Sequence, residues 1–203
     1  MIVTETFTSL QGEGKNQGKP CFFLRLSGCN LRCAWCDTEY SFEKGTERSI
    51  EELVKEIADS GFSYVCVTGG EPLLQKKELI PLLTILREAG IQTDIETNGT
   101  ISFKDCKPYA SVCMDVKCPS SGQMSDLSLL NDLTESDSVK FVIGDEADYI
   151  YMVHVLSAYK KLRAEIIITP VYGTDTKWLV ETIIKENLPV RFQIQLHKLE
   201  EIK

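Results

Sequence analysis

The chain has 203 residues and a formal net charge of −8 at pH 7. It is long enough for one domain, expected over residues 1–203, and its acidic surface should repel phosphate backbones, which argues against nucleic acid as a partner. No apolar run is long enough to span a membrane, and residues 1–10 lack the basic and apolar regions of a secretory signal, so we expect a cytoplasmic protein that acts on a small molecule.

Short apolar runs alternate with amphipathic stretches along the chain. In chain order they predict a strand at 21–26, a helix at 50–60, a strand at 64–68, a helix at 76–89, strands at 92–96, 111–115 and 139–143, a helix at 146–161, a strand at 165–169, a helix at 176–186 and a strand at 190–196. Ser49 and Glu52 have the spacing of a capping box, and Gly61 follows the end of that helix. The polar stretch 119–138 is expected to hold only a short helix.

Strands that alternate with helices predict a parallel sheet with right-handed crossovers. Six or seven strands are too few for a closed eight-stranded barrel. We therefore expect an α/β fold, a partial, open and trimmed TIM-type barrel of mainly parallel strands, with its site at the C-terminal ends of the strands. Residues suited to a site follow four of these strands, at Gly28-Cys29, Gly69-Gly70, Asn98-Gly99 and Lys117.

Three of the eight cysteines are tightly clustered, as Cys29, Cys33 and Cys36 in the spacing C-x3-C-x2-C. In a reducing compartment, three thiolates on one loop can hold three corners of a 4Fe–4S cluster and leave one iron open. The alternative is a structural zinc site completed by His154, His197 or a distant cysteine, although zinc sites usually combine two cysteine pairs. The other five cysteines, Cys21, Cys66, Cys106, Cys113 and Cys118, are spread out. The last three form a loose C-x6-C-x4-C that could hold an auxiliary cluster, but we expect separate thiols and one cluster per chain.

This cysteine spacing, with Trp35 directly before the last cysteine, resembles the signature of the radical S-adenosylmethionine (SAM) superfamily. Thr68-Gly-Gly-Glu-Pro72 resembles its G-G-E-P element, although alone it could be a plain turn. The resemblance implies that SAM binds the open iron and yields a 5′-deoxyadenosyl radical once an electron donor such as flavodoxin or ferredoxin reduces the cluster. The SAM contacts that it implies are Trp35, Cys36, Asp37, Gly70, Glu71, Glu96, Asn98, Asp115 and Lys117. Taken alone, the last four could equally cap loops.

Two further stretches bear on the substrate. Gln11 and Glu13 lie in the pattern F-x-S-x-Q-G-E-G of residues 7–14, just before the first expected strand. They could hydrogen-bond the amide and amidine edge of a pterin, or belong to a polar turn built by the glycines. Arg25 lies in an apolar strand, where its burial is costly without an anion. A substrate carboxylate would suit its guanidinium, and so would an acidic side chain.

These stretches, together with Asp37-Thr38 and the closing Q-x-Q-x-H-K of residues 193–198, resemble the family of 7-carboxy-7-deazaguanine synthases over nearly the whole chain. The resemblance implies that Thr38 helps to hold Mg2+. It also implies that the last strand aims His197 toward the substrate, although a lone histidine at a strand end is more often structural. The implied substrate contacts are Leu10, Gln11, Gly12, Glu13, Arg25, Thr68 and His197.

The activity implied by this resemblance is a radical-mediated, Mg2+-assisted ring contraction. It converts 6-carboxy-5,6,7,8-tetrahydropterin to 7-carboxy-7-deazaguanine with loss of ammonia, in queuosine- or archaeosine-type deazapurine synthesis for tRNA. No catalytic residue beyond the cluster and its cofactor is implied, and analogy with the family favours a homodimer. Two alternatives remain open. One is an activating enzyme for a glycyl-radical enzyme, which shares the cysteine spacing, and the other is a non-catalytic zinc or iron–sulfur binding module, which would not cleave SAM.

Overall fold

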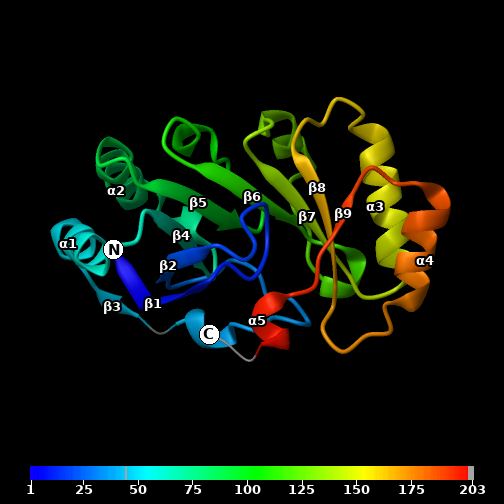
Figure 1. The fold of residues 1–203 in the computed structure, drawn as a ribbon, viewed down its shortest axis with the longest axis horizontal. Helices are drawn as coiled ribbons and strands as arrows, with labels where there is room; N and C mark the ends of the chain where they lie inside the picture. The colour runs from blue at the N-terminus through cyan, green and yellow to red at the C-terminus, as the bar shows by residue number, and fades with distance from the viewer. Residues whose placement is uncertain (44, 201–203) are drawn as a thin grey trace.

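The computed structural model describes residues 1–43 and 45–200, in which nine strands form one open sheet (Figure 1). The order across the sheet is β3-β1-β2-β4-β5-β6-β7-β8-β9. The strands are β1 (Ile2–Leu10), β2 (Pro20–Leu26), β3 (Thr46–Glu47), β4 (Tyr64–Gly69), β5 (Gln92–Thr97), β6 (Ser111–Val116), β7 (Ser138–Ile143), β8 (Glu165–Pro170) and β9 (Arg191–Phe192). From β2 through β9 the pairs are parallel. The predicted α/β class with a mainly parallel sheet is confirmed. Residues 201–203 of the expected domain lie outside the described residues.

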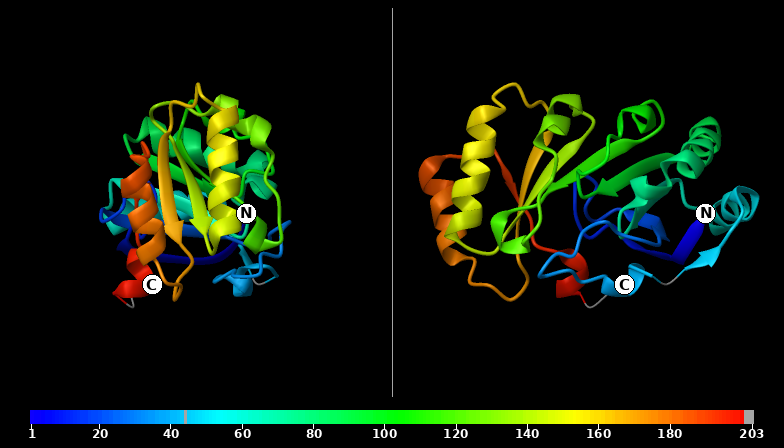
Figure 2. Two further views of the ribbon diagram at one scale, coloured as in Figure 1. Left: turned by 90° about the vertical axis from the view of Figure 1, so that its right-hand side faces the viewer. Right: turned by 180° about the vertical axis from the view of Figure 1, so that it is seen from behind.

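The α-helices between strands lie on the outer side of the sheet, as Figure 2 shows from two further directions, whereas the last helix follows β9 and reaches the cavity. The α-helices are α1 (Ile50–Ser60), α2 (Lys76–Glu88), α3 (Glu146–Ala158), α4 (Lys177–Glu186) and α5 (Leu196–Leu199). The predicted capping box of Ser49 and Glu52 is present, and Gly61 ends α1 in the left-handed conformation, with φ 73°. The stretch 119–138 holds two short 3-10 helices, Pro119–Ser121 and Leu127–Asp132. None of the described helices is long and apolar enough to cross a membrane.

The two faces of the sheet differ in chemistry. Alternate strand residues that face the helices are apolar and fully buried, such as Leu24, Val67, Ile95, Met114 and Phe141. Their neighbours along the strands face a cavity and are polar or charged, such as Arg25, Thr68, Glu96, Asp115 and Lys140. Because side chains alternate across a strand, each strand contributes to the core with one set of residues and to the cavity with the other.

Strand β1 is missing from the sequence-based prediction. It pairs antiparallel with β2 along its length, and β3 pairs antiparallel with its start. Residues 7–10 therefore belong to a strand and do not merely precede one. The sequence Ile2-Val-Thr-Glu-Thr-Phe-Thr-Ser-Leu10 hides this strand, because one of its residues, Val3, is buried and the others are partly or fully exposed. An edge region of this kind lacks the apolar run that marked the central strands.

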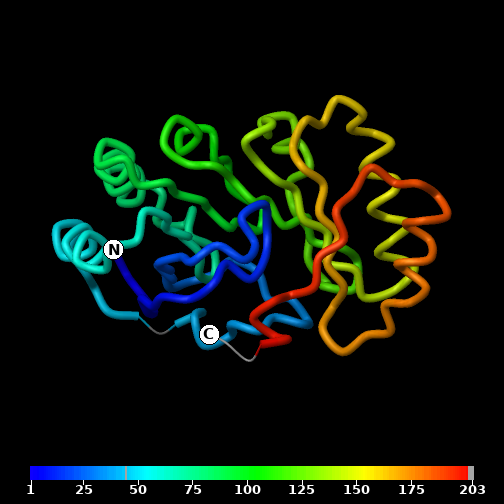
Figure 3. The backbone as a smooth tube through the Cα atoms, in the orientation of Figure 1, coloured from blue at the N-terminus to red at the C-terminus, as the bar shows by residue number. Residues whose placement is uncertain are grey.

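The end of the chain also differs from the prediction. The strand expected at 190–196 is reduced to β9, and His197 lies on α5 rather than at a strand end. The reason is a competing partner, because residues 193–196 hydrogen-bond with the loop after β1 instead of extending the sheet. Figure 3 shows these two segments, blue and red, side by side. Helix α3 also ends at Ala158, three residues before the predicted Lys161.

Candidate active site

A cavity of about 460 Å³ opens on the polar face of the sheet, at the C-terminal ends of the strands. This volume suits a small molecule rather than a macromolecule. Every predicted site residue except Glu71 lines it: Leu10, Gln11, Gly12, Glu13, Arg25, Cys29, Cys33, Trp35, Cys36, Asp37, Thr38, Thr68, Gly70, Glu96, Asn98, Asp115, Lys117 and His197. The structure thus brings together residues from five different strand ends and from the C-terminal segment.

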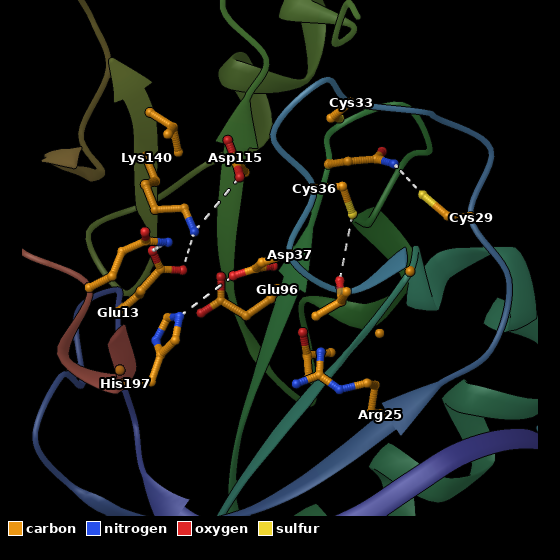
Figure 4. A pocket seen from close by; sticks show the side chains of 18 of the residues that line it. Glu13, Arg25, Cys29, Cys33, Cys36, Asp37, Glu96, Asp115, Lys140 and His197 are labelled. Carbon is orange, nitrogen blue, oxygen red and sulfur yellow. Dashed lines mark hydrogen bonds and ion pairs between the residues drawn. The ribbon is translucent and has the colours of Figure 1, made fainter. Parts of the chain in front are cut away.

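The three clustered thiols lie on the loop after β2 and face one side of the cavity (Figure 4). The amide Nδ2 of Asn98 lies 3.9 Å from Cys29 Sγ, and the Leu31 N–H lies 3.5 Å from the same sulfur. Amide donors aimed at a sulfur suit a thiolate better than a thiol. Burial raises the pKa of the Cys33 thiol, and the Lys117 ammonium opposes that shift. The loop therefore presents sulfur ligands in a polar setting.

These donors fit a 4Fe–4S cluster better than a single zinc ion. Within residues 1–43 and 45–200, no three His, Cys, Asp or Glu side chains converge on one metal position. A cube needs no such convergence, because each thiolate binds a different iron. His154, a possible zinc ligand, is exposed on α3 and does not line the cavity. Of the other thiols, Cys106 and Cys118 are buried in the apolar core. Cys113, in β6, is also buried but points to the other face of the sheet, away from this core.

The glycines after β4 bring two loops into contact. A Cβ on Gly70 would lie 2.2 Å from the carbonyl oxygen of Gly28, a distance that no side chain tolerates. The Glu71 N–H donates to that same carbonyl at 2.8 Å. This close approach sets the cysteine loop beside the Gly69-Gly70 turn, where a bound cofactor would meet both.

Glu71 is the predicted site residue that does not line the cavity, and its contact with SAM stays a prediction. Its carboxylate is fully buried and accepts hydrogen bonds from the Asn98 N–H at 2.7 Å, the Thr97 hydroxyl at 2.9 Å and the Leu73 N–H at 3.0 Å. Burial raises its pKa, and these donors partly offset the shift. The side chain therefore ties the end of β4 to the end of β5 and shapes the cavity from behind.

Trp35, Thr38 and Lys117 all lie on the thiol side of the cavity. The Trp35 indole N–H donates to Ser120 Oγ at 3.1 Å, and the Lys117 ammonium lies 5.1 Å from the centre of the Trp35 ring. The Thr38 hydroxyl is 3.8 Å from Cys36 Sγ. These contacts hold the predicted SAM and Mg2+ residues close to the cysteine loop.

Asp115 offers a free acceptor to a ligand. Its Oδ2 is paired with the Lys117 ammonium at 2.9 Å, while its buried Oδ1 finds no hydrogen-bond partner among the residues that the structure describes. Burial would raise the pKa of Asp115, but the charges of Lys117 and Lys140 outweigh it and lower the pKa. A buried acceptor without a partner is costly unless a ligand satisfies it.

The sequence left two possible partners for Arg25, an acidic side chain and a substrate carboxylate. The structure shows an ion pair with an acidic side chain. Its Nε donates to Glu5 Oε1 at 2.9 Å, and the Tyr40 hydroxyl donates to the same oxygen at 2.8 Å. Its guanidinium lies 5.6 Å from the centre of the Phe7 ring. The pair fixes the guanidinium at the cavity wall, and a carboxylate contact by Arg25 stays a prediction.

A link between the cysteine loop and α5 closes one end of the cavity. The Asp37 carboxylate lies 2.9 Å from Lys198 Nζ and 3.7 Å from His197 Nε2. Burial opposes ionisation of Asp37, but the hydrogen bonds from His197 and Lys198 outweigh it and hold its pKa well below the usual range. A Cβ on Gly12 would lie 2.3 Å from His197 Nδ1, so this glycine is what lets the imidazole pack there.

Several polar residues of the site escaped the sequence-based prediction. Lys140 and Gln195 both contact the Glu13 carboxylate, and Tyr64 donates to Asp94 at 2.7 Å beneath the cavity. One of them carries a signal that the sequence argument could have used. Lys140 interrupts the apolar run of β7, Ser-Val-Lys-Phe-Val-Ile, and a lysine buried in such a strand needs a counter-charge.

Glu96 is an acid whose ionisation falls near neutral pH. Burial raises its pKa to about 7, the Lys140 ammonium opposes the shift, and the charge of Glu13 adds to it. The Gln11 amide lies 3.5 Å from Glu96 Oε1, so a change in its charge is felt by the residues beside it. Glu96 can therefore gain or lose a proton in the cavity at physiological pH.

We expect the Glu96→Gln variant to have a flatter dependence of stability on pH. The folded protein holds the Glu96 proton more tightly than the unfolded chain, whose glutamate has a pKa of 4.5. Its stabilising contribution is therefore complete below pH 4.5 and is lost as the pH rises through about 7. Urea unfolding should show wild-type stability falling by about 2 kcal/mol more than that of the variant between pH 5 and pH 8. If the stability of the wild type and of the variant depended equally on pH, the proton would belong to another group.

Comparisons with known proteins agree with this geometry. The family model of the radical SAM superfamily matches residues 24–116. A 7-carboxy-7-deazaguanine synthase of Methanospirillum hungatei JF-1 is 49% identical over 198 residues, which cover 98% of this chain and 84% of the relative. The enzymes of the same name from Koribacter versatilis and Thermoplasma acidophilum are 36% and 35% identical, each match covering 98% of this chain and 96% of the relative.

Solved structures show the same fold. The crystal structure of QueE from Escherichia coli matches with a TM-score of 0.82 and 30% identity, over 97% of this chain and 94% of that chain. Streptococcus suis SuiB matches with a TM-score of 0.63 at 14% identity, over 85% of this chain and 47% of that chain, which shows a shared fold alone.

Proposed function

Because the chain belongs to the family of 7-carboxy-7-deazaguanine synthases within the radical SAM superfamily, we propose that it converts 6-carboxy-5,6,7,8-tetrahydropterin to 7-carboxy-7-deazaguanine with loss of ammonia. The observation that carries this proposal is the two-sided cavity. Three thiols lie on one side of it, and Glu13, Lys140 and His197 lie on the other, with Asp115 between them (Figure 4). A place for a radical source and a polar surface for the substrate thus share one cavity.

The thiol side suits a 4Fe–4S cluster held by Cys29, Cys33 and Cys36. Together with SAM, such a cluster supplies the 5′-deoxyadenosyl radical that removes a hydrogen atom from the substrate. The chain's own part is to orient the cofactor with the Gly70 turn, Asn98 and the unpaired oxygen of Asp115. Electrons must come from outside, and we propose a flavodoxin or a ferredoxin as the donor.

The opposite side suits the pterin ring. The Glu13 carboxylate can accept two N–H groups of the amidine edge, and the adjacent Gln11 can pair with the amide edge. A ligand without these groups would not form these hydrogen bonds, which is the basis of specificity. Arg25 at the wall offers a cation for the substrate carboxylate, with its orientation set by Glu5.

The ring contraction requires proton transfers and releases ammonia. Glu96 has a pKa of about 7 in this cavity and so can exchange a proton at neutral pH. We propose that Thr38, beside the cysteine loop, helps to bind Mg2+, whose other ligands would be oxygens of the substrate and water. By analogy with the family we also propose a homodimer that works in the cytoplasm and feeds deazapurine synthesis for tRNA.

Turnover with a reconstituted cluster tests the proposal. The protein is loaded with iron and sulfide without oxygen, reduced, and given SAM, Mg2+ and 6-carboxytetrahydropterin, with products identified by mass spectrometry. We expect 7-carboxy-7-deazaguanine, and less of it when Mg2+ is omitted. 5′-Deoxyadenosine without that product would keep the radical chemistry and reject the substrate, as for a glycyl-radical activating enzyme. Neither product from a reduced, intact cluster would favour a non-catalytic module.

A further inference from the structure

A buried lysine stands at the centre of the substrate side of the cavity. Lys140 lies in β7, is 5% exposed, and faces the cavity rather than the core. Its Nζ lies 2.6 Å from Glu13 Oε2 and 3.7 Å from Asp115 Oδ2, as the dashed lines of Figure 4 show. The second oxygen of Glu13 accepts a hydrogen bond from Gln195 Nε2 at 2.9 Å. Both carboxylate oxygens are therefore fixed by side chains that come from elsewhere in the chain.

Glu13 needs such support because of its position. It lies on the loop between β1 and β2, between two glycines, and a loop of that composition does not hold a side chain in one place. Lys140 comes from a central strand of the sheet, which is the most rigid kind of element available to a site. The contact with Lys140 therefore holds the loop carboxylate of Glu13 in a fixed position relative to the strand.

Lys140 also balances the charge of the cavity. The acidic groups that face it are Glu13 from the loop, Asp115 and the Cys113 thiol from β6, and Glu96 from β5. Burial alone would lower the pKa of Lys140, but these acids outweigh burial and raise the pKa well above its usual value. Without the cation, several buried carboxyl groups would share one space, and one of them would take up a proton.

We propose that Lys140 is a positioning residue for substrate recognition, which keeps the Glu13 carboxylate oriented toward the pterin amidine edge. This inference rests on the proposed function. Without Lys140 the loop carboxylate would be free to turn away from the N–H groups of the substrate, so the match to the substrate would be lost. A buried ion pair adds little to stability compared with apolar residues, which fits a role in recognition rather than in folding.

Binding without turnover tests the inference. The cluster-loaded enzyme is mixed with SAM and 6-carboxytetrahydropterin in the absence of reductant, and the dissociation constant is measured at pH 8. We expect Lys140→Met to weaken binding about tenfold, the size of one charged hydrogen bond. In a Glu13→Gln background, the same change at Lys140 should alter binding less than about twofold, because its target is gone.

Controls separate this role from a general loss of structure. Lys107 forms a comparable, partly buried ion pair with Asp137 outside the cavity, so Lys107→Met should lower stability and leave pterin binding unchanged. Iron content should be equal in the Lys140 variants and the wild type. If Lys140→Met does not fold, Lys140→Gln, which keeps a donor without the charge, gives the same double-mutant comparison.

The possible failures are distinct. A wild-type enzyme that does not bind the pterin overturns the proposed function, and the recognition role of Lys140 with it. A wild type that binds, together with a Lys140 variant of unchanged affinity, overturns the inference alone. An equally large effect of the Lys140 change in the Glu13→Gln background would show that the lysine does not act through Glu13.

Discussion

Replacement of Cys33 by alanine is expected to abolish turnover while the protein stays folded. Cys33 is one of three thiols on the loop after β2, and in the proposed function each holds one corner of the cluster. The apolar core lies on the other face of the sheet and shares no side chain with that loop. Loss of a thiol should therefore remove the cluster without removing the interactions that stabilise the fold.

The measurements are iron per protomer, the visible absorption of the cluster, cleavage of SAM under reducing conditions, and thermal unfolding. We expect iron and SAM cleavage to fall to background and the unfolding temperature to match that of metal-free wild type. Cys118→Ala is the matched control, because this thiol is fully buried in the core. It should cost stability and leave iron unchanged. A Cys33 variant that unfolds, as a zinc-dependent domain does without metal, would instead indicate a structural metal site.

Replacement of Gly70 by alanine is expected to damage both stability and cofactor binding. The added Cβ would lie 2.2 Å from the carbonyl oxygen of Gly28 and 2.7 Å from the Cβ of Cys29, so one loop must move away from the other. Overpacking against main chain of this kind costs about 3 kcal/mol. Because Cys29 is the first proposed cluster ligand of the loop, the movement should also lower iron loading and SAM affinity.

Gly61→Ala provides the comparison. Gly61 has φ 73° at the end of α1, and a Cβ there would meet no atom within 4 Å. The change should cost about 1 kcal/mol from backbone strain alone and leave iron loading intact. Urea unfolding gives the cost of each substitution, and iron analysis with SAM titration gives its effect on the site. A Gly70 variant that loses stability but binds iron and SAM normally would contradict the link between the two loops.

Local signals explain why most of the fold could be predicted. The capping box at Ser49 and the glycine after α1 act through neighbours in sequence, and the buried central strands are short apolar runs between turn residues. Strand β1 was missed because its residues are mostly half-exposed and alternate weakly. Strand β9 was overestimated because residues 193–196 bind a distant loop, a choice that no local pattern reveals.

The residues of the site also divide into those that the sequence could predict and those that it could not. Cys29, Gly70 and Lys117 could be found because topology places strand ends together, so position along the sequence was enough. The interaction partners of the site residues could not be found in this way. Lys140 pairs with Glu13 across 127 positions of sequence, and Asp37 pairs with the C-terminal helix, so each depends on how the finished fold closes. Glu71 belongs to a motif that the sequence revealed, but its buried carboxylate supports the wall of the cavity from behind.

The contacts between the loop after β1 and the segment before α5 also bear on how the molecule is made. Gln193 donates to the carbonyl of Gly14, a residue synthesised 179 positions earlier. Contacts so far apart in sequence form late in folding, and a nascent chain on the ribosome would carry the cysteine loop and the central sheet long before it could hold Glu13 in place. Truncated translation products would therefore be able to take up iron while lacking a finished pterin compartment.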